Sequence, residues 1–140
     1  MNTRTTWQVA ALALLLGVSG CSGSGLVKAS GKLTYKGQPV PSTLVTFQPE
    51  DGSRRSTGVT DDEGNFTLRF SRTQEGVKRG PHTVFLKYEV SVDEELHKIK
   101  PRASKELKKV IAQYGDAKKA PRDMHYEVTE SGQFFEIELQ

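Results

Sequence analysis

The sequence contains very little cysteine and tryptophan, with one residue of each, Cys21 and Trp7, among 140. A single cysteine excludes an intramolecular disulfide. Because Trp7 lies close to the amino terminus, the rest of the chain lacks the side chain that most often stacks against sugars. The three histidines, His82, His97 and His125, are too far apart to show a spacing typical of zinc ligands. We therefore expect neither a disulfide framework nor a zinc centre.

Motifs for catalysis and for nucleic-acid binding are also absent. No Gly-x-Ser-x-Gly motif follows a strand-like segment, so the sequence shows no assembled nucleophile. The 20 Lys and Arg residues barely exceed the 17 Asp and Glu residues, and the two signs are interleaved. A nucleic-acid site would instead gather its positive charge together with base-contacting residues. We expect a non-catalytic protein that uses no cofactor and binds no nucleic acid.

No acidic residue precedes Glu50, and the first part of this stretch is a signal for export. Arg4 and the free amino terminus supply positive charge, and Val9–Val18 is an unbroken run of apolar and small residues. A charged start followed by a short apolar run is typical of a secretory signal peptide. The run is shorter than the roughly 20 apolar residues that a transmembrane helix needs.

A lipid-attachment motif ends this run. The residues Val18-Ser19-Gly20-Cys21 resemble the lipobox of bacterial lipoproteins. The resemblance implies cleavage between Gly20 and Cys21 and attachment of acyl chains such as palmitate to Cys21, and two or more chains anchor a protein stably. The alternative is an ordinary secretory cleavage beside a coincidental cysteine. We expect residues 1–20 to be a lipoprotein signal peptide and the protein to be anchored in the cell envelope, facing the periplasm or the exterior.

Residues 21–25 predict a short flexible link, because Ser22-Gly23-Ser24-Gly25 is of the Gly/Ser type. From residue 26 onward, apolar and polar residues alternate as in half-buried strands. Turn residues separate the alternating segments, which are 27–35, 43–48, 56–60, 66–70, 82–90, 124–128 and 134–139. Short strands at regular spacing predict an all-β, antiparallel β-sandwich of about seven strands over residues 26–140. The last two segments are separated by a short turn and predict a terminal hairpin.

The alternation breaks between residues 91 and 123, which we interpret as an insertion that carries one helix. Ser104 is a candidate N-cap, and apolar residues recur after it at helical spacing. The basic residues of the insertion are Lys98, Lys100, Arg102, Lys105, Lys108, Lys109, Lys118, Lys119 and Arg122. A solvated helix face explains this charge. The alternative is contact with anionic lipid headgroups or an acidic polymer near the anchor.

An ordered series of short motifs runs through nearly the whole region after the link. It comprises Gly31–Pro41, Val45–Gly52, Thr57–Asp61, Gly64–Leu68, Gly80–Val84 and Phe135–Leu139. This series resembles the small planctomycete lipoproteins that carry a carboxypeptidase regulatory-like, transthyretin-like domain. The resemblance implies a Greek-key sandwich and implies little about activity. Transthyretin-like hydrolases of hydroxyisourate end in Tyr-Arg-Gly-Ser, whereas this chain ends in Glu138-Leu139-Gln140.

Two groups of residues are candidates for ligand binding. Alternate oxygen ligands around a glycine can bind calcium, which makes Asp61, Glu63 and Asn65 weak metal candidates. A plain acidic turn that binds no metal is the alternative. The candidate aromatic residues for a carbohydrate site are Tyr35, Tyr126 and Phe134.

The sequence favours a binding role over a catalytic one. His82 has the inward parity of its strand, so we expect it to be partly buried and hydrogen-bonded rather than functional. The first hypothesis is a lipid-anchored, non-catalytic β-sandwich that binds or scaffolds at the cell envelope, with an envelope protein or polysaccharide as partner. The second is a carbohydrate- or calcium-binding module, and the third is a small hydrolase.

Overall fold

The computed structural model describes residues 25–89, 91–93, 98–100 and 103–140. The expected signal peptide 1–20, the cleavage site at Gly20 and the lipid-attachment residue Cys21 lie outside the described residues, as does His97. The strands are β1 (Leu26–Val27), β2 (Ala29–Tyr35), β3 (Gln38–Pro39), β4 (Thr43–Pro49), β5 (Ser56–Val59), β6 (Asn65–Thr67), β7 (Val77–Lys78), β8 (Gly80–Tyr88), β9 (Ser91–Asp93), β10 (Lys98–Lys100), β11 (His125–Val128) and β12 (Gln133–Leu139). The helix is α1 (Lys105–Gln113), and two 3₁₀ turns, η1 (Ala117–Lys119) and η2 (Arg122–Met124), follow it.

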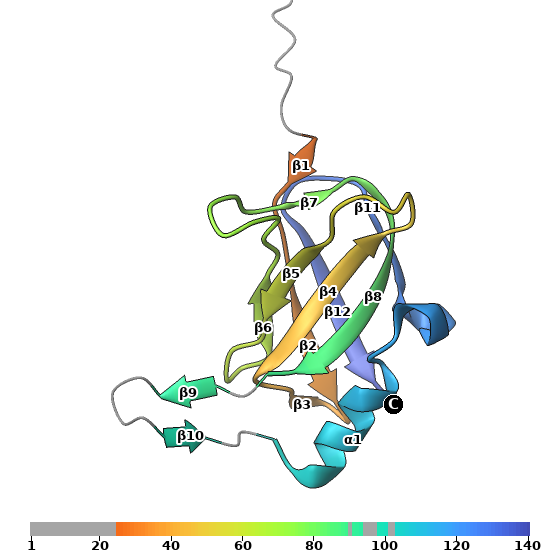
Figure 1. Cartoon of the computed structure of the whole chain (residues 1–140). Coiled ribbons are helices and arrows are strands. Elements are labelled where there is room, and N and C mark those ends of the chain that lie inside the picture. Colours follow the sequence, from red (N-terminus) through yellow and green to blue (C-terminus); the bar gives the residue numbers. More distant parts are fainter. Residues whose placement is uncertain (1–24, 90, 94–97, 101–102) are drawn as a thin grey trace, which may run out of the picture.

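Two β-sheets pack face to face to form the body of the protein (Figure 1). One sheet has the strand order β11-β8-β4-β5, and the other has the order β12-β2-β3 with β6 also paired to β2. The predicted all-β sandwich is therefore confirmed. The first sheet is antiparallel throughout. In the second sheet β12 runs parallel to β2, which departs from the fully antiparallel pairing that we expected.

The alternation of residue types places a row of side chains from the longer strands in the core. In β12, Phe135, Ile137 and Leu139 are at most 5% exposed, while the residues between them face the solvent. Burial of a side chain of this size stabilises the fold by about 1.5–3 kcal/mol. The rings of Phe47 on β4 and Phe135 on β12 meet across the core, with centroids 5.0 Å apart. The core extends from Val27 to Leu139, so the chain after Cys21 contains all of it.

The predicted terminal hairpin is wrong, because the last two strands belong to different sheets. β11 pairs with β8, and β12 pairs with β2. The side chain of Gln133 stabilises the connection from β11 to β12. Its Nε2 donates to the Glu127 carbonyl at 2.9 Å, and its Oε1 accepts from the Thr129 N–H at 2.9 Å. Both strands alternate correctly, but alternation defines only which face is buried and not which strand lies alongside.

The insertion contains the expected helix. Ser104 is its N-cap, and the Ser104 Oγ accepts from the Leu107 N–H at 3.1 Å. Val110 and Ile111 are buried where α1 packs against β8. The carbonyl of Tyr114, just after α1, accepts from the Leu86 N–H at 2.9 Å, which ties the end of the helix to the edge of β8. The insertion also contains the antiparallel pair β9–β10, which the sequence did not predict.

The strand register defines two ends of the sandwich. Ala29 lies beside Gln133, and Gly80 lies beside Val128. These positions are at the end of the molecule where β1 and β7 lie, which we call the β1 pole (Figure 1). The opposite end, where α1 lies, is the helix pole. The helix α1 is thus at the far end of the sandwich from the first described residues (Figure 1).

Candidate anion-binding groove

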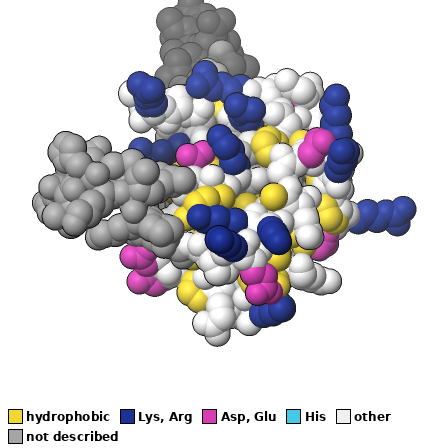
Figure 2. Space-filling model, turned by 60° about the horizontal axis from the view of Figure 1, so that its bottom comes forward, with side chains coloured by type: hydrophobic (Ala, Val, Ile, Leu, Met, Phe, Trp, Pro, Cys, Tyr) yellow, Lys and Arg dark blue, Asp and Glu magenta, His cyan; other side chains and the backbone are white. Residues whose placement is uncertain are grey.

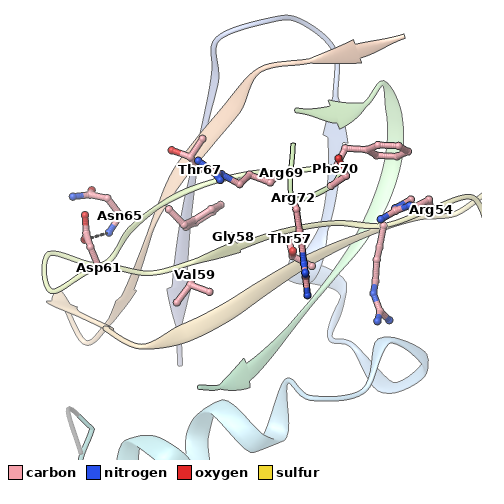
Figure 3. A pocket seen from close by; sticks show the side chains of 13 residues that line it. Arg54, Thr57, Gly58, Val59, Asp61, Asn65, Thr67, Arg69, Phe70 and Arg72 are labelled. Atoms are coloured by element: carbon pink, nitrogen blue, oxygen red, sulfur yellow. Dashed lines mark hydrogen bonds between the residues drawn. The ribbon is translucent and has the colours of Figure 1, made fainter. Parts of the chain in front are cut away.

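A groove of about 960 Å³ opens on the flank of the sandwich, along β5 and the segment 65–72 (Figure 3). Four arginines line it: Arg54, Arg55, Arg69 and Arg72. All four side chains belong to exposed residues. Asp61 is the single acidic residue among the described residues that line the groove. The groove is therefore strongly basic, although the chain as a whole is close to neutral.

Backbone pairing brings the arginines together from both sides of the turn at 61–65. The Thr57 N–H donates to the Arg69 carbonyl at 2.9 Å, and the Arg69 N–H donates to the Thr57 carbonyl at 2.8 Å. Gly58 makes this approach possible, because a Cβ at that position would lie 2.6 Å from the Thr67 carbonyl oxygen. Directly after this pair the chain reverses in a turn, where the Phe70 N–H donates to the Gln74 carbonyl at 2.9 Å, and Arg72 lies in that turn. The hairpin therefore gathers arginines that lie in two separate parts of the sequence.

The four arginines differ in how they are held. Arg54 stacks over the ring of Phe70, with 5.3 Å between its guanidinium carbon and the ring centroid. Arg69 pairs with Glu75 at 3.4 Å. Arg55 and Arg72 have no acidic partner among the described residues. Since a guanidinium presents a planar set of donors that matches carboxylate and phosphate groups, two of these side chains are available to bind an anion and a third is pre-positioned by stacking.

The candidate calcium residues form a turn at one end of the groove. The Asp61 Oδ1 accepts from the Glu63 N–H at 3.0 Å and from the Asn65 N–H at 2.8 Å. Gly64 has a φ of +79°, as the turn requires. Asp61 and Asn65 line the groove, whereas Glu63 does not. Among the residues that the structure describes, no group of three or more His, Cys, Asp or Glu side chains is placed to hold a metal ion.

The histidine prediction is confirmed for His82. Its side chain is fully buried, and its Nδ1 lies 2.9 Å from the Gly80 carbonyl oxygen. Burial lowers the pKa of His82, and the nearby Gly80 carbonyl opposes this shift. His125 instead lies at the exposed edge of β11, where its Nδ1 is 3.2 Å from Glu50 Oε1. Neither the groove nor the second cavity described below is lined by a described histidine.

The candidate aromatic residues do not form one platform. Tyr126 faces the core, where its ring lies 5.7 Å from that of Phe135, and burial raises the pKa of its hydroxyl. Phe134 is 53% exposed and points away from the core on the adjacent position of β12. Tyr35 lies at the end of β2, where its hydroxyl donates to Glu106 Oε1 at 3.5 Å.

The sequence analysis missed the arginines of the groove. Their sequence signal was their symmetric placement about the acidic turn: 54 and 55 on one side, 69 and 72 on the other. A hairpin centred on that turn places Arg69 beside Thr57 of β5. The alternation of β5 and β6 predicts the strands but not the position of the residues that flank them.

No family model and no curated protein matches the sequence. Among solved structures, a DUF3823 family protein from Parabacteroides merdae is similar with a TM-score of 0.42 and 10% identity over 81% of this chain. A 9R-lipoxygenase from Cyanothece is similar with a TM-score of 0.31 and 14% identity over 81% of this chain. The chain spans 45% of the first structure and 17% of the second. These similarities assign no function. Within the described part of the chain, no helix has the length and apolar character needed to cross a membrane.

Proposed function

We propose that the protein is a lipid-anchored, non-catalytic binding domain of the bacterial cell envelope, and that its arginine groove binds an anionic envelope polymer. The observation that carries this proposal is the convergence of Arg54, Arg55, Arg69 and Arg72 on one groove with a single acidic lining residue. A polysaccharide with repeated carboxylate or phosphate groups fits this arrangement, because several charge-assisted hydrogen bonds can form along an open groove.

The anchor is supported by the amino-terminal sequence. The lipobox-like residues end at Cys21, and the first strand starts at Leu26. The short connection would hold the domain close to the membrane surface. The resemblance to planctomycete lipoproteins with a carboxypeptidase regulatory-like domain supports the same location.

A binding role fits the chemistry of the groove better than catalysis does. Its described lining is dominated by arginine side chains and includes no histidine or cysteine. Asp61 and Ser71 also line it, but the Asp61 carboxylate already accepts two backbone hydrogen bonds within its own turn. The hydrolase hypothesis required a polar pocket around a histidine. His82 lies in the core and His125 at an exposed edge.

The groove can be tested with residues 22–140, since this part of the chain contains the whole core. We expect calorimetric titration with an oligogalacturonate, a polycarboxylate probe, to show saturable binding. A charge-assisted hydrogen bond contributes about 1.5–3 kcal/mol. Replacing three of them in the variant R54Q/R55Q/R72Q should therefore weaken binding by at least about tenfold.

The matched control removes the same charge elsewhere, in the variant K28Q/K118Q/K119Q at three exposed lysines. We expect it to change the affinity by less than about twofold at 0.15 M salt, where distant surface charges are screened. Equal losses in the two variants would show attraction to net charge alone, and absence of binding to the unmodified domain would contradict the proposal.

A further inference from the structure

A second cavity, of about 410 Å³, lies between α1 and the outer face of the β8–β4–β5 sheet. We call it the helix cleft. One wall includes Lys108 and Ala112 of α1, and the other consists of Leu44 on β4 and Phe85 on β8. Leu44 and Phe85 alternate with the core residues Val45 and Leu86, so they point away from the core, and both are half-buried.

The helix cleft has a buried floor and a fixed wall. Thr46 and Ile111 line it although they are only 3% and 1% exposed, which places them at its bottom. The helix wall is held by the hydrogen bond from the Leu86 N–H to the Tyr114 carbonyl. The Tyr114 hydroxyl also accepts from the Gln140 N–H at 3.3 Å, which ties the same segment to the carboxyl terminus. The cleft is therefore a preformed feature of the fold, of the size that small-molecule sites have.

Cationic side chains surround the apolar walls. Arg55, Lys87 and Lys108 line the helix cleft, and no acidic residue lines it among the described residues. Lys108 lies over the ring of Tyr88, with its Nζ 4.7 Å from the centroid. Lys87 Nζ lies 3.7 Å from Glu89, while Arg55 has no acidic partner in the described part of the chain. Figure 2 shows this side of the molecule, where yellow hydrophobic side chains alternate with dark-blue Lys and Arg side chains.

We infer that the helix cleft binds a single-chain anionic amphiphile, such as a fatty acid. Its aliphatic chain would lie between Leu44, Phe85 and Ile111, where it is removed from water. Its carboxylate would pair with Arg55 and Lys108 at the rim. An apolar body with one anionic end matches both the walls and the charge of this cavity. The site differs from the arginine groove in its lining, with only Arg55 and Thr57 common to both.

The test uses residues 22–140 and dodecanoate below its micellar concentration, with calorimetry as the readout. We expect saturable binding of one dodecanoate per chain, and binding of dodecyltrimethylammonium, which has the same chain and the opposite charge, at least about tenfold weaker. The variant A112E places a carboxylate in the cleft at an exposed helix position, so the fold is retained. It should weaken dodecanoate binding by at least about tenfold through charge repulsion and loss of space.

The matched control is K109E, which introduces negative charge on α1 at an exposed residue that does not line the cleft. We expect it to change the affinity by less than about threefold. Equal weakening by A112E and K109E would overturn the inference, as would equal affinity for the two amphiphiles or the absence of saturable binding. Because neither residue lines the arginine groove, polymer binding by both variants should remain as in the unmodified domain, so the two sites can fail independently.

Discussion

At the scale of single residues, His82 is the most deeply buried titratable side chain in the described part of the chain. It is fully buried, and its ring centroid lies 5.9 Å from that of Phe47. One ring nitrogen is satisfied by the Gly80 carbonyl, whereas Nε2 has no hydrogen-bond partner among the described residues. A neutral imidazole that donates from Nδ1 fits this environment, because protonation would turn Nε2 into a donor without an acceptor in the core.

This burial predicts a pH-dependent stability. The pKa of His82 is lowered in the folded state, so below the ordinary value of 6.5 the unfolded chain takes up a proton that the folded protein resists. We expect the free energy of unfolding, measured by urea denaturation of residues 22–140, to fall as the pH is lowered from 7 to 5. The slope for one proton is at most about 1.4 kcal/mol per pH unit.

The variant H82F should flatten this dependence, because its ring fills a similar volume beside Phe47 without titrating. The unmodified domain, measured over the same pH range, is the reference for this comparison. A slope that persists in H82F would show that another group is responsible.

At the scale of secondary-structure elements, local signals identified the pieces of the fold but not all of their partners. The Ser104 cap and the helical spacing of Val110 and Ile111 predicted α1, and period-two alternation predicted the main strands. The pairing of β12 with β2, rather than with β11, depends on contacts between residues about 100 positions apart, such as Phe135 and Gly31. The backbone at Gly31 leaves no space for a side chain, because a Cβ atom there would lie 2.4 Å from the Phe135 carbonyl oxygen. Close packing between two strands that are distant in sequence produces no recognisable pattern of residue types in either strand.

The candidate sites show the same limit. The inward position of His82 followed from parity within one strand, although its side chain is fully buried where parity predicted partial burial. The groove depends on the pairing of Thr57 with Arg69, and the helix cleft depends on the packing of α1 against β8. Both sites arise from the relative placement of elements, which residue types within one segment do not encode.

The N-cap of α1 gives a prediction at this scale. In S104A the Leu107 N–H loses its acceptor, so we expect the free energy of unfolding to decrease by about 1 kcal/mol. S104D should retain most of the stability, because its carboxylate can accept the same hydrogen bond and favours the helix amino terminus. Thermal unfolding followed by circular dichroism measures the effect, with S131A in an exposed turn as control. Equal stability of S104A and S131A would contradict the capping role.

At the scale of the whole molecule, the proposed anchor predicts a defined mass. The protein extracted from bacterial membranes should lack residues 1–20 and should carry acyl chains on Cys21, as intact-mass spectrometry would show. The variant C21S should lose the acyl mass and leave the membrane fraction, because no covalent lipid would remain. Retention of residues 1–20, or cleavage with an unmodified Cys21, would remove the support for an envelope anchor.

The opposite placement of β1 and α1 gives the domain a direction. If Cys21 carries the lipid, at most about 14 Å of chain separates it from Gly25, so the bilayer lies beneath the β1 pole. The nine residues of β8 run from that pole toward α1 and span about 30 Å. The sandwich then holds the helix cleft away from the membrane surface, and the acyl chains of that bilayer cannot reach the cleft. An amphiphile bound there would have to arrive from the aqueous side, by diffusion or from another carrier. The end of the domain away from the membrane would therefore be the end that takes up the ligand.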